Sequence, residues 1–208
     1  MFKEKTTFAE KFIELRNKKA EQQAVQDTSN NIHQGMVVMN QRIYEIEEKE
    51  IADGRISMHM PSEFEPLEDN LAEAKYPHFM CPQYIYSDKT TSVTMTFTFD
   101  DKTMEEDEIH ELKEQLIYIL SDLHPECEIL DDEMLQAEEL DIELFSFAKP
   151  VMDGELYQLF SLMRWNEKLL LGGFNCDMQV KDSWYPVICQ MLQTIRLINK
   201  DENIGEEI

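Results

Sequence analysis

One pair of residues has a spacing that could support nucleophilic catalysis. His78 and Cys81 are three residues apart in the run His-Phe-Met-Cys, where an imidazole could deprotonate a thiol. The neighbours Phe79, Met80 and Pro82 are typical of a packed loop, which favours a structural role. The sequence contains no GxSxG, phosphate-binding loop, GxGxxG or HExxH motif. We therefore predict that the protein is not an enzyme, unless a site is assembled from residues far apart in the sequence.

Clusters of acidic residues are the other candidates for chemistry, because paired carboxylates can transfer protons or hold a divalent cation. They occupy residues 100–101, 105–108, 131–133 and 138–139. None has the spacing of an EF-hand loop. Glu105 and Glu106 fall in the first turn of a predicted helix, where carboxylates interact favourably with the helix dipole. We interpret His110, between acids on that helix, as a solvated neighbour of Asp107 or Glu111. We expect solvated faces, no metal site and no cofactor.

The four cysteines do not have the spacing of a metal site or a redox motif. They are Cys81, Cys127, Cys176 and Cys189. No CxxC pair and no nearby pair of histidines accompanies them. We expect four buried free thiols, with one disulfide or a zinc site as alternatives.

One acidic stretch, residues 63–73, places carboxylates around apolar side chains in a predicted surface excursion. The carboxylates that we predict to bind a partner are Glu65, Glu68, Asp69 and Glu73. The apolar residues among them are Phe64, Leu67 and Leu71. Acids around apolar anchors suit a basic, amphipathic partner segment. The simpler interpretation is a loop that packs its apolar residues and solvates its acids.

The charge of the chain is strongly negative and unevenly distributed. The formal net charge is −24, yet residues 1–50 hold nearly equal numbers of basic and acidic residues. An acidic body repels phosphate backbones and anionic lipids, so we expect no binding to nucleic acid. The negative charge of the body keeps the protein soluble or, alternatively, attracts a basic protein partner. No run approaches the roughly 18 apolar residues that span a membrane.

The first 34 residues differ in composition from the rest. The spacing of Thr7 and Glu10 predicts a capping box, followed by a helix with Phe8, Phe12 and Leu15 on one face. A polar linker then extends to residue 34. This helix could pack on the body, bind a partner, touch a membrane or form a homodimer through residues 1–34. Because the N-terminus has no apolar signal-peptide core, we expect a cytoplasmic protein.

The remaining pattern predicts an α+β domain over residues 35–200 and an acidic tail over 201–208. Ser92–Phe99 alternates strictly and has one wet or helix-free face. A helix over residues 103–124 follows. The runs 142–147, 156–165 and 169–174 form a long C-terminal meander, with turns at 152–154 and 165–168. Apolar spacing from Trp184 to Ile195 then predicts a last helix. The fold class is an antiparallel β-sheet flanked by two main helices, plus the N-terminal helical extension.

The order of these elements resembles the PsbP-like fold group (Mog/PsbP, DcrB-type). Gly54-x-Ile-x-Met-x-Met-Pro61-x-x-Phe64 is similar to the entry strand of that group. The strand–helix unit 92–124, the meander 140–176 and a last helix ending Met-Leu-Gln-Thr-Ile-Arg-Leu-Ile198 follow in the same order. The resemblance covers about residues 36–199. It departs from the group in its N-terminal helical extension and in lacking a leader or lipobox. It implies a scaffold with diverse binding roles and no shared chemistry.

These observations favour a non-catalytic, cytoplasmic protein-binding module, an adaptor or chaperone-like factor for a basic or amphipathic partner. The alternative is a small-molecule or metal-binding protein with a pocket between sheet and helix.

Overall fold

The computed structural model describes residues 31–76, 81–138 and 140–198. Two antiparallel sheets and three α-helices make up this part of the chain. The smaller sheet has the order β1 (Met36–Met39), β2 (Arg42–Ile51), β3 (Ile56–Pro61) and β11 (Arg196–Leu197). The larger sheet has the order β4 (Glu65–Pro66), β5 (Tyr84–Ser87), β6 (Thr94–Thr103), β10 (Lys168–Asp177), β9 (Gly154–Trp165), β8 (Asp141–Val151) and β7 (Glu128–Gln136). The helices are α2 (Asp69–Lys75), α3 (Glu106–Leu123) and α4 (Lys181–Gln193), with short 3-10 turns η1 (Ile32–Gln34) and η3 (Met178–Val180).

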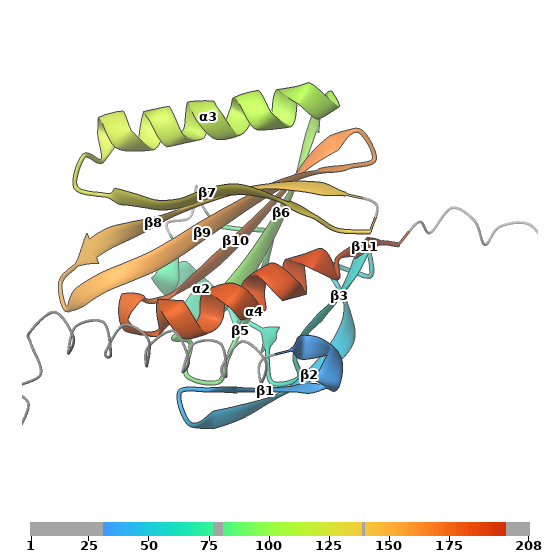
Figure 1. Cartoon of the computed structure of the whole chain (residues 1–208), viewed down its shortest axis with the longest axis vertical. Helices are drawn as coiled ribbons and strands as arrows, with labels where there is room; N and C mark the ends of the chain where they lie inside the picture. Colours follow the sequence, from blue (N-terminus) through green and yellow to red (C-terminus); the bar gives the residue numbers. More distant parts are fainter. Residues whose placement is uncertain (1–30, 77–80, 139, 199–208) are drawn as a thin grey trace, which may run out of the picture.

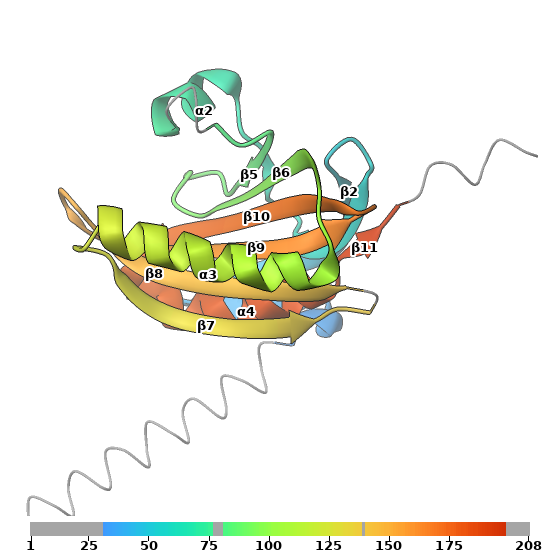
Figure 2. The same cartoon turned by 90° about the horizontal axis from the view of Figure 1, so that it is seen from above.

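The larger sheet lies in the middle of the molecule, with α3 on one face and α4 with the smaller sheet on the other (Figure 1). Seen from above, α3 runs over β8 and β9, and α2 lies apart from it, near β5 (Figure 2). Strand β8 shows why both faces are covered: seven consecutive residues, 142–148, are buried. A strand that is apolar on both sides must be packed on both sides.

Two apolar clusters hold these layers together. The larger cluster joins the sheet to α4 and the smaller sheet, and the smaller cluster joins it to α3. Trp184 of α4 lies at the centre of the larger cluster, with ring centroids 5.2 Å from Tyr44, 5.8 Å from Phe64 and 5.7 Å from Phe174. The six positions predicted from Trp184 to Ile195 are all buried. The last helix of the prediction is therefore confirmed up to Gln193, but its predicted end at Ile198 was wrong: Ile195 is buried beyond α4, and Arg196–Leu197 form β11, which pairs with β3.

The predicted alternation of the Ser92–Phe99 strand is also found. Val93, Met95, Phe97 and Phe99 are buried in the larger cluster. On the other face Thr96 and Thr98 are half-buried, whereas Thr94 is fully buried. The predicted fold class, an antiparallel sheet with a long C-terminal meander and two main helices, is confirmed.

Some local predictions were wrong. Helix α3 begins at Glu106, three residues after its predicted start, and its capping box joins Glu105 and Glu108. The four thiols are free, but only Cys176 is fully buried and Cys81 is exposed. The end of the predicted linker forms η1, whose Ile32 is buried in the core. The rest of the predicted N-terminal helix and linker, and residues 199–208, lie outside the described residues.

Candidate binding pocket

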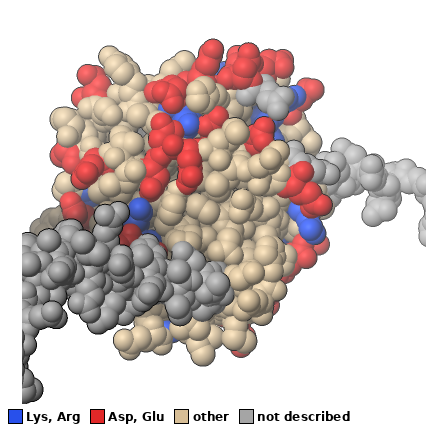
Figure 3. Space-filling view, viewed as in Figure 1, with Lys and Arg blue, Asp and Glu red and all other residues tan. Residues whose placement is uncertain are grey.

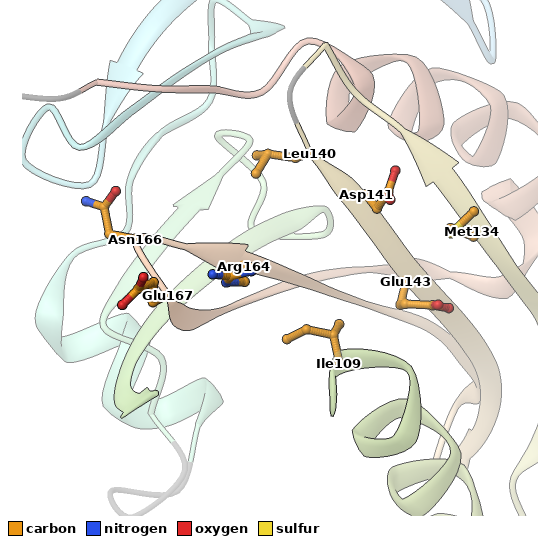
Figure 4. Close-up of a pocket in the computed structure, with 8 residues that line it drawn as sticks. All are labelled: Ile109, Met134, Leu140, Asp141, Glu143, Arg164, Asn166 and Glu167. Atoms are coloured by element: carbon orange, nitrogen blue, oxygen red, sulfur yellow. The ribbon is translucent and has the colours of Figure 1, made fainter. Parts of the chain in front are cut away.

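A cavity of about 420 Å³ opens between the first turn of α3 and one end of the larger sheet. It is lined by Ile109, Met134, Leu140, Asp141, Glu143, Arg164, Asn166 and Glu167. These residues come from α3, β7, the β7–β8 connection (Leu140), the start of β8, the end of β9 and the β9–β10 turn. Arg164 lies in the middle of the labelled side chains, with Ile109 on one side and Leu140 and Asp141 on the other (Figure 4).

The β9–β10 turn fixes one wall of the pocket. Trp165 pairs with Lys168, and the two residues between them have positive φ, 47° at Asn166 and 61° at Glu167. This is the type I′ geometry that a two-residue hairpin favours, although neither residue is glycine. The carbonyl of Glu167 accepts a hydrogen bond from the Met104 amide at 2.7 Å, which joins the turn to the segment before α3.

The apolar part of the pocket has both buried and accessible side chains. Ile109 is buried in the cluster under α3, and Leu140 is half-buried. Met134, on edge strand β7, is 59% exposed. An exposed, flexible methionine next to buried aliphatic carbon suits an adaptable apolar contact.

A cluster of charged side chains holds α3 onto β7 and β8 behind the pocket. Lys113 of α3 has only 4% of its side chain exposed, and its ammonium lies 2.6 Å from Asp132 Oδ1 and 2.7 Å from Glu143 Oε2. Glu143 Oε1 lies 2.9 Å from His110 Nδ1. The His110 side chain is exposed, as predicted, but its acidic neighbour is Glu143 of β8 instead of Asp107 or Glu111 on its own helix. Glu143 is engaged on both oxygens.

The pKa of Lys113 follows from this environment. Burial by itself lowers the pKa of the ammonium group, but hydrogen bonds and attraction from Asp132 and Glu143 outweigh it, so the pKa is raised. Lys113 stays charged at neutral pH and pairs with both carboxylates.

The charges at the pocket are mostly negative. Asp141 and Glu167 are exposed at its rim, and Glu143 lies deeper. Acidic side chains gather over the upper part of the molecule in Figure 3, where α3 lies, whereas the lower face shows few charges. The pocket thus combines an apolar floor, an acidic rim and one guanidinium.

The predicted partner-binding residues lie elsewhere. Glu65, Glu68, Asp69 and Glu73 are all exposed, on β4 and α2. Their strand β4 is at the opposite edge of the larger sheet from β7. Of the three apolar anchors, Phe64 is fully buried against Trp184, Leu67 is half-buried and Leu71 is 43% exposed. Of the proposed anchors only Phe64 belongs to the core, and these four acids remain a prediction.

Two charged residues at otherwise apolar positions of the sequence indicate how α3 packs beside the pocket. Glu143 interrupts the apolar run 142–147, and Lys113 follows Leu112 on the buried side of α3. A charged residue in a strand that is buried on both faces requires a partner of opposite charge. An ion pair between Lys113 and Glu143, inferred from the sequence, would have predicted that α3 packs on β8.

The other residues considered for chemistry are only partly within the described chain. Cys81 is exposed, and His78 lies outside the described residues. Within residues 31–76, 81–138 and 140–198, no group of three or more His, Cys, Asp or Glu is arranged to hold a metal ion. No helix of the described chain has the length and apolar character to cross a membrane.

Comparisons with known proteins bear on the fold. No family model and no curated protein matches the chain. The solution structure of cyanobacterial PsbP (CyanoP) from Synechocystis sp. PCC 6803 is similar with a TM-score of 0.53 and 9% identity, over 76% of this chain and 96% of that one. A crystal structure from Bacteroides thetaiotaomicron gives a TM-score of 0.51 and 10% identity, over 75% of this chain and 50% of that one. At such identities the likeness concerns the fold alone, and the chain has a PsbP-like fold over most of its length.

Proposed function

We propose that this protein is a non-catalytic module that binds a basic, amphipathic segment of another protein in the pocket between α3 and the larger sheet. The observation that carries the proposal is the combination of apolar side chains with rim carboxylates at one accessible cavity. An apolar residue of the partner would lie against Ile109, Met134 and Leu140. Lysine or arginine beside it would face Asp141 and Glu167.

The magnitudes support a weak and salt-sensitive interaction. Burying one large apolar side chain contributes about 1.5–3 kcal/mol. Each exposed ion pair at the rim adds about 0.2–1 kcal/mol and is screened by salt. The lost freedom of the partner opposes both, so we expect weak binding, with a Kd on the order of 1 mM.

The test is the affinity for fluorescein-labelled peptides in which Leu, Phe or Met is flanked by Lys or Arg, measured by anisotropy at low and high salt. The pocket variant is Asp141→Lys/Glu167→Lys. The matched control is Glu68→Lys/Asp69→Lys, which makes the same change of charge at the other edge of the sheet. We expect roughly tenfold weaker binding for the pocket variant and less than threefold for the control.

Both contrary results are informative. Loss of binding in the Glu68→Lys/Asp69→Lys variant alone would move the partner site to α2, as the sequence predicted. Absence of binding by every peptide would overturn the proposed function.

A small-molecule-binding protein is the second candidate, because the cavity volume lies within the range of about 300–1,000 Å³ found for ligand pockets. A ligand that selects the folded state raises the melting temperature. A panel of metabolites and cations that raises it by no measurable amount would remove this candidate.

A further inference from the structure

Arg164 differs from the other arginines of the described residues. Arg42 lies beside Glu63, and Arg196 lies 3.1 Å from Glu138. The guanidinium of Arg55 lies over the rings of Phe99 and Trp165, 4.9 and 5.8 Å from their centroids. Each of these three cations thus has a partner within the fold.

Arg164 is half-buried and lines the cavity, yet it forms no ion pair with any carboxylate whose side chain the structure describes. Extending the β8–β9 register, in which Ile142 faces Met163, puts Asp141 across from Arg164, but the two side chains form no ion pair. Glu143 is held by Lys113 and His110 instead. A half-buried guanidinium with five donors and no acidic partner is suited to bidentate recognition of an incoming carboxylate.

The surroundings of Arg164 restrict the kind of carboxylate. The rim acids Asp141 and Glu167 disfavour a ligand with net negative charge. Ile109 and Leu140 line the same cavity as Arg164, so they favour an apolar group close to the carboxylate. A C-terminal residue meets both conditions, because its α-carboxylate and its side chain are attached to the same Cα. Basic residues just before it can face the rim acids.

We propose that Arg164 binds the C-terminal carboxylate of the partner, so that the recognised segment ends in the pocket with an apolar last residue preceded by Lys or Arg. This inference rests on the proposed function and specifies its ligand. It makes Arg164 the residue that distinguishes a chain end from an internal segment. A small molecule with a carboxylate next to an apolar group would offer Arg164 the same two features, so it is tested as the other possible ligand.

The experiment compares peptides that end in Lys-Arg-Lys-Leu or Lys-Arg-Lys-Phe as free acids and as C-terminal amides, with N-acetyl-leucine as the small carboxylate. The protein is the full chain, either unchanged or with Arg164→Gln or Arg164→Lys. Arg196→Gln is the matched control, because it removes an exposed arginine that already has partners. Melting temperatures of all variants verify that they are folded.

We expect the free acids to bind at least tenfold more tightly than the amides, as a charge-assisted hydrogen-bonded pair requires. The preference should disappear in Arg164→Gln, persist in part in Arg164→Lys and be unchanged in Arg196→Gln. Equal binding of acids and amides would overturn the inference and leave the proposed function intact. If no peptide binds, both the inference and the proposed function are overturned. If N-acetyl-leucine binds as tightly as the peptide acids, the ligand of Arg164 is a small apolar carboxylate and not the C-terminus of a protein.

Discussion

Replacement of Lys113 by methionine tests whether the charged cluster behind the pocket is a buried structural unit. Methionine keeps most of the apolar stem and removes the ammonium group. Asp132, with 45% of its side chain exposed, can then be hydrated again. The side chain of Glu143 is only 12% exposed, and His110 would be its one remaining partner in this cluster.

The expected loss follows from these exposures. Removing one partner of a buried ion pair costs about 3–5 kcal/mol. In Lys113→Met, Asp132 is hydrated again and Glu143 keeps its contact with His110. We therefore expect a loss of unfolding free energy near the lower end of this range, at about 3 kcal/mol. For a domain of this size that corresponds to roughly 6–12 °C in melting temperature.

The assay is urea unfolding followed by tryptophan fluorescence, because Trp184 lies in the core and reports its exposure. The double variant Lys113→Met/Glu143→Leu removes both buried charges and should recover most of the loss. The raised pKa of Lys113 adds a pH dependence. The Lys113 ammonium group stabilises the fold fully at pH values below its pKa in the unfolded chain, about 10.4. This stabilisation is lost as the pH rises through the higher pKa of Lys113 in the folded protein.

Two results would refute this reasoning. A loss below about 1 kcal/mol for Lys113→Met would show that the cluster behaves as a solvated surface pair. A stability difference between the natural chain and Lys113→Met that fell between pH 7 and 9 would contradict the raised pKa.

Two further predictions concern packing and thiol chemistry. A Cβ at residue 172 would lie 2.2 Å from Ser161 Oγ, so Gly172→Ala should destabilise the fold by about 1–3 kcal/mol. The double variant Gly172→Ala/Ser161→Ala should recover much of this in urea unfolding, and no recovery would contradict the clash. Cys81 is exposed, whereas Cys176 is fully buried and its burial raises the pKa of the thiol to about 12. A thiol reagent should therefore label Cys81 in the folded protein and Cys176 only after unfolding, and equal labelling rates would contradict that burial.

The fold could be predicted where a local pattern determines burial. The strict alternation of the Ser92–Phe99 run and the spacing from Trp184 to Leu192 each depend on neighbours within one element. The turn at Asn166 and Glu167 was predicted from its place between two apolar runs. These features need no knowledge of which strands pair.

The pocket could not be predicted in the same way, because it depends on the strand order. Ile109, Glu143 and Arg164 come together only because β9 lies next to β8 in the sheet and α3 crosses both. The burial of Phe64 in the acidic stretch at residues 63–73 could not be predicted for a related reason. Its local pattern cannot show that Phe64 reaches the core and contacts Trp184, a residue far away in the sequence.

The central claim is that a basic, amphipathic segment binds in the pocket of α3 and the larger sheet. The most direct measurement is a methyl NMR titration of the full chain, labelled at Ile, Leu and Met methyl groups, with the Lys-Arg-Lys-Leu peptide acid. The account predicts shifts for Ile109, Met134 and Leu140 and none for Leu71 on α2. Shifts at Leu71 without shifts at the three pocket residues, or no shifts at all, would contradict it.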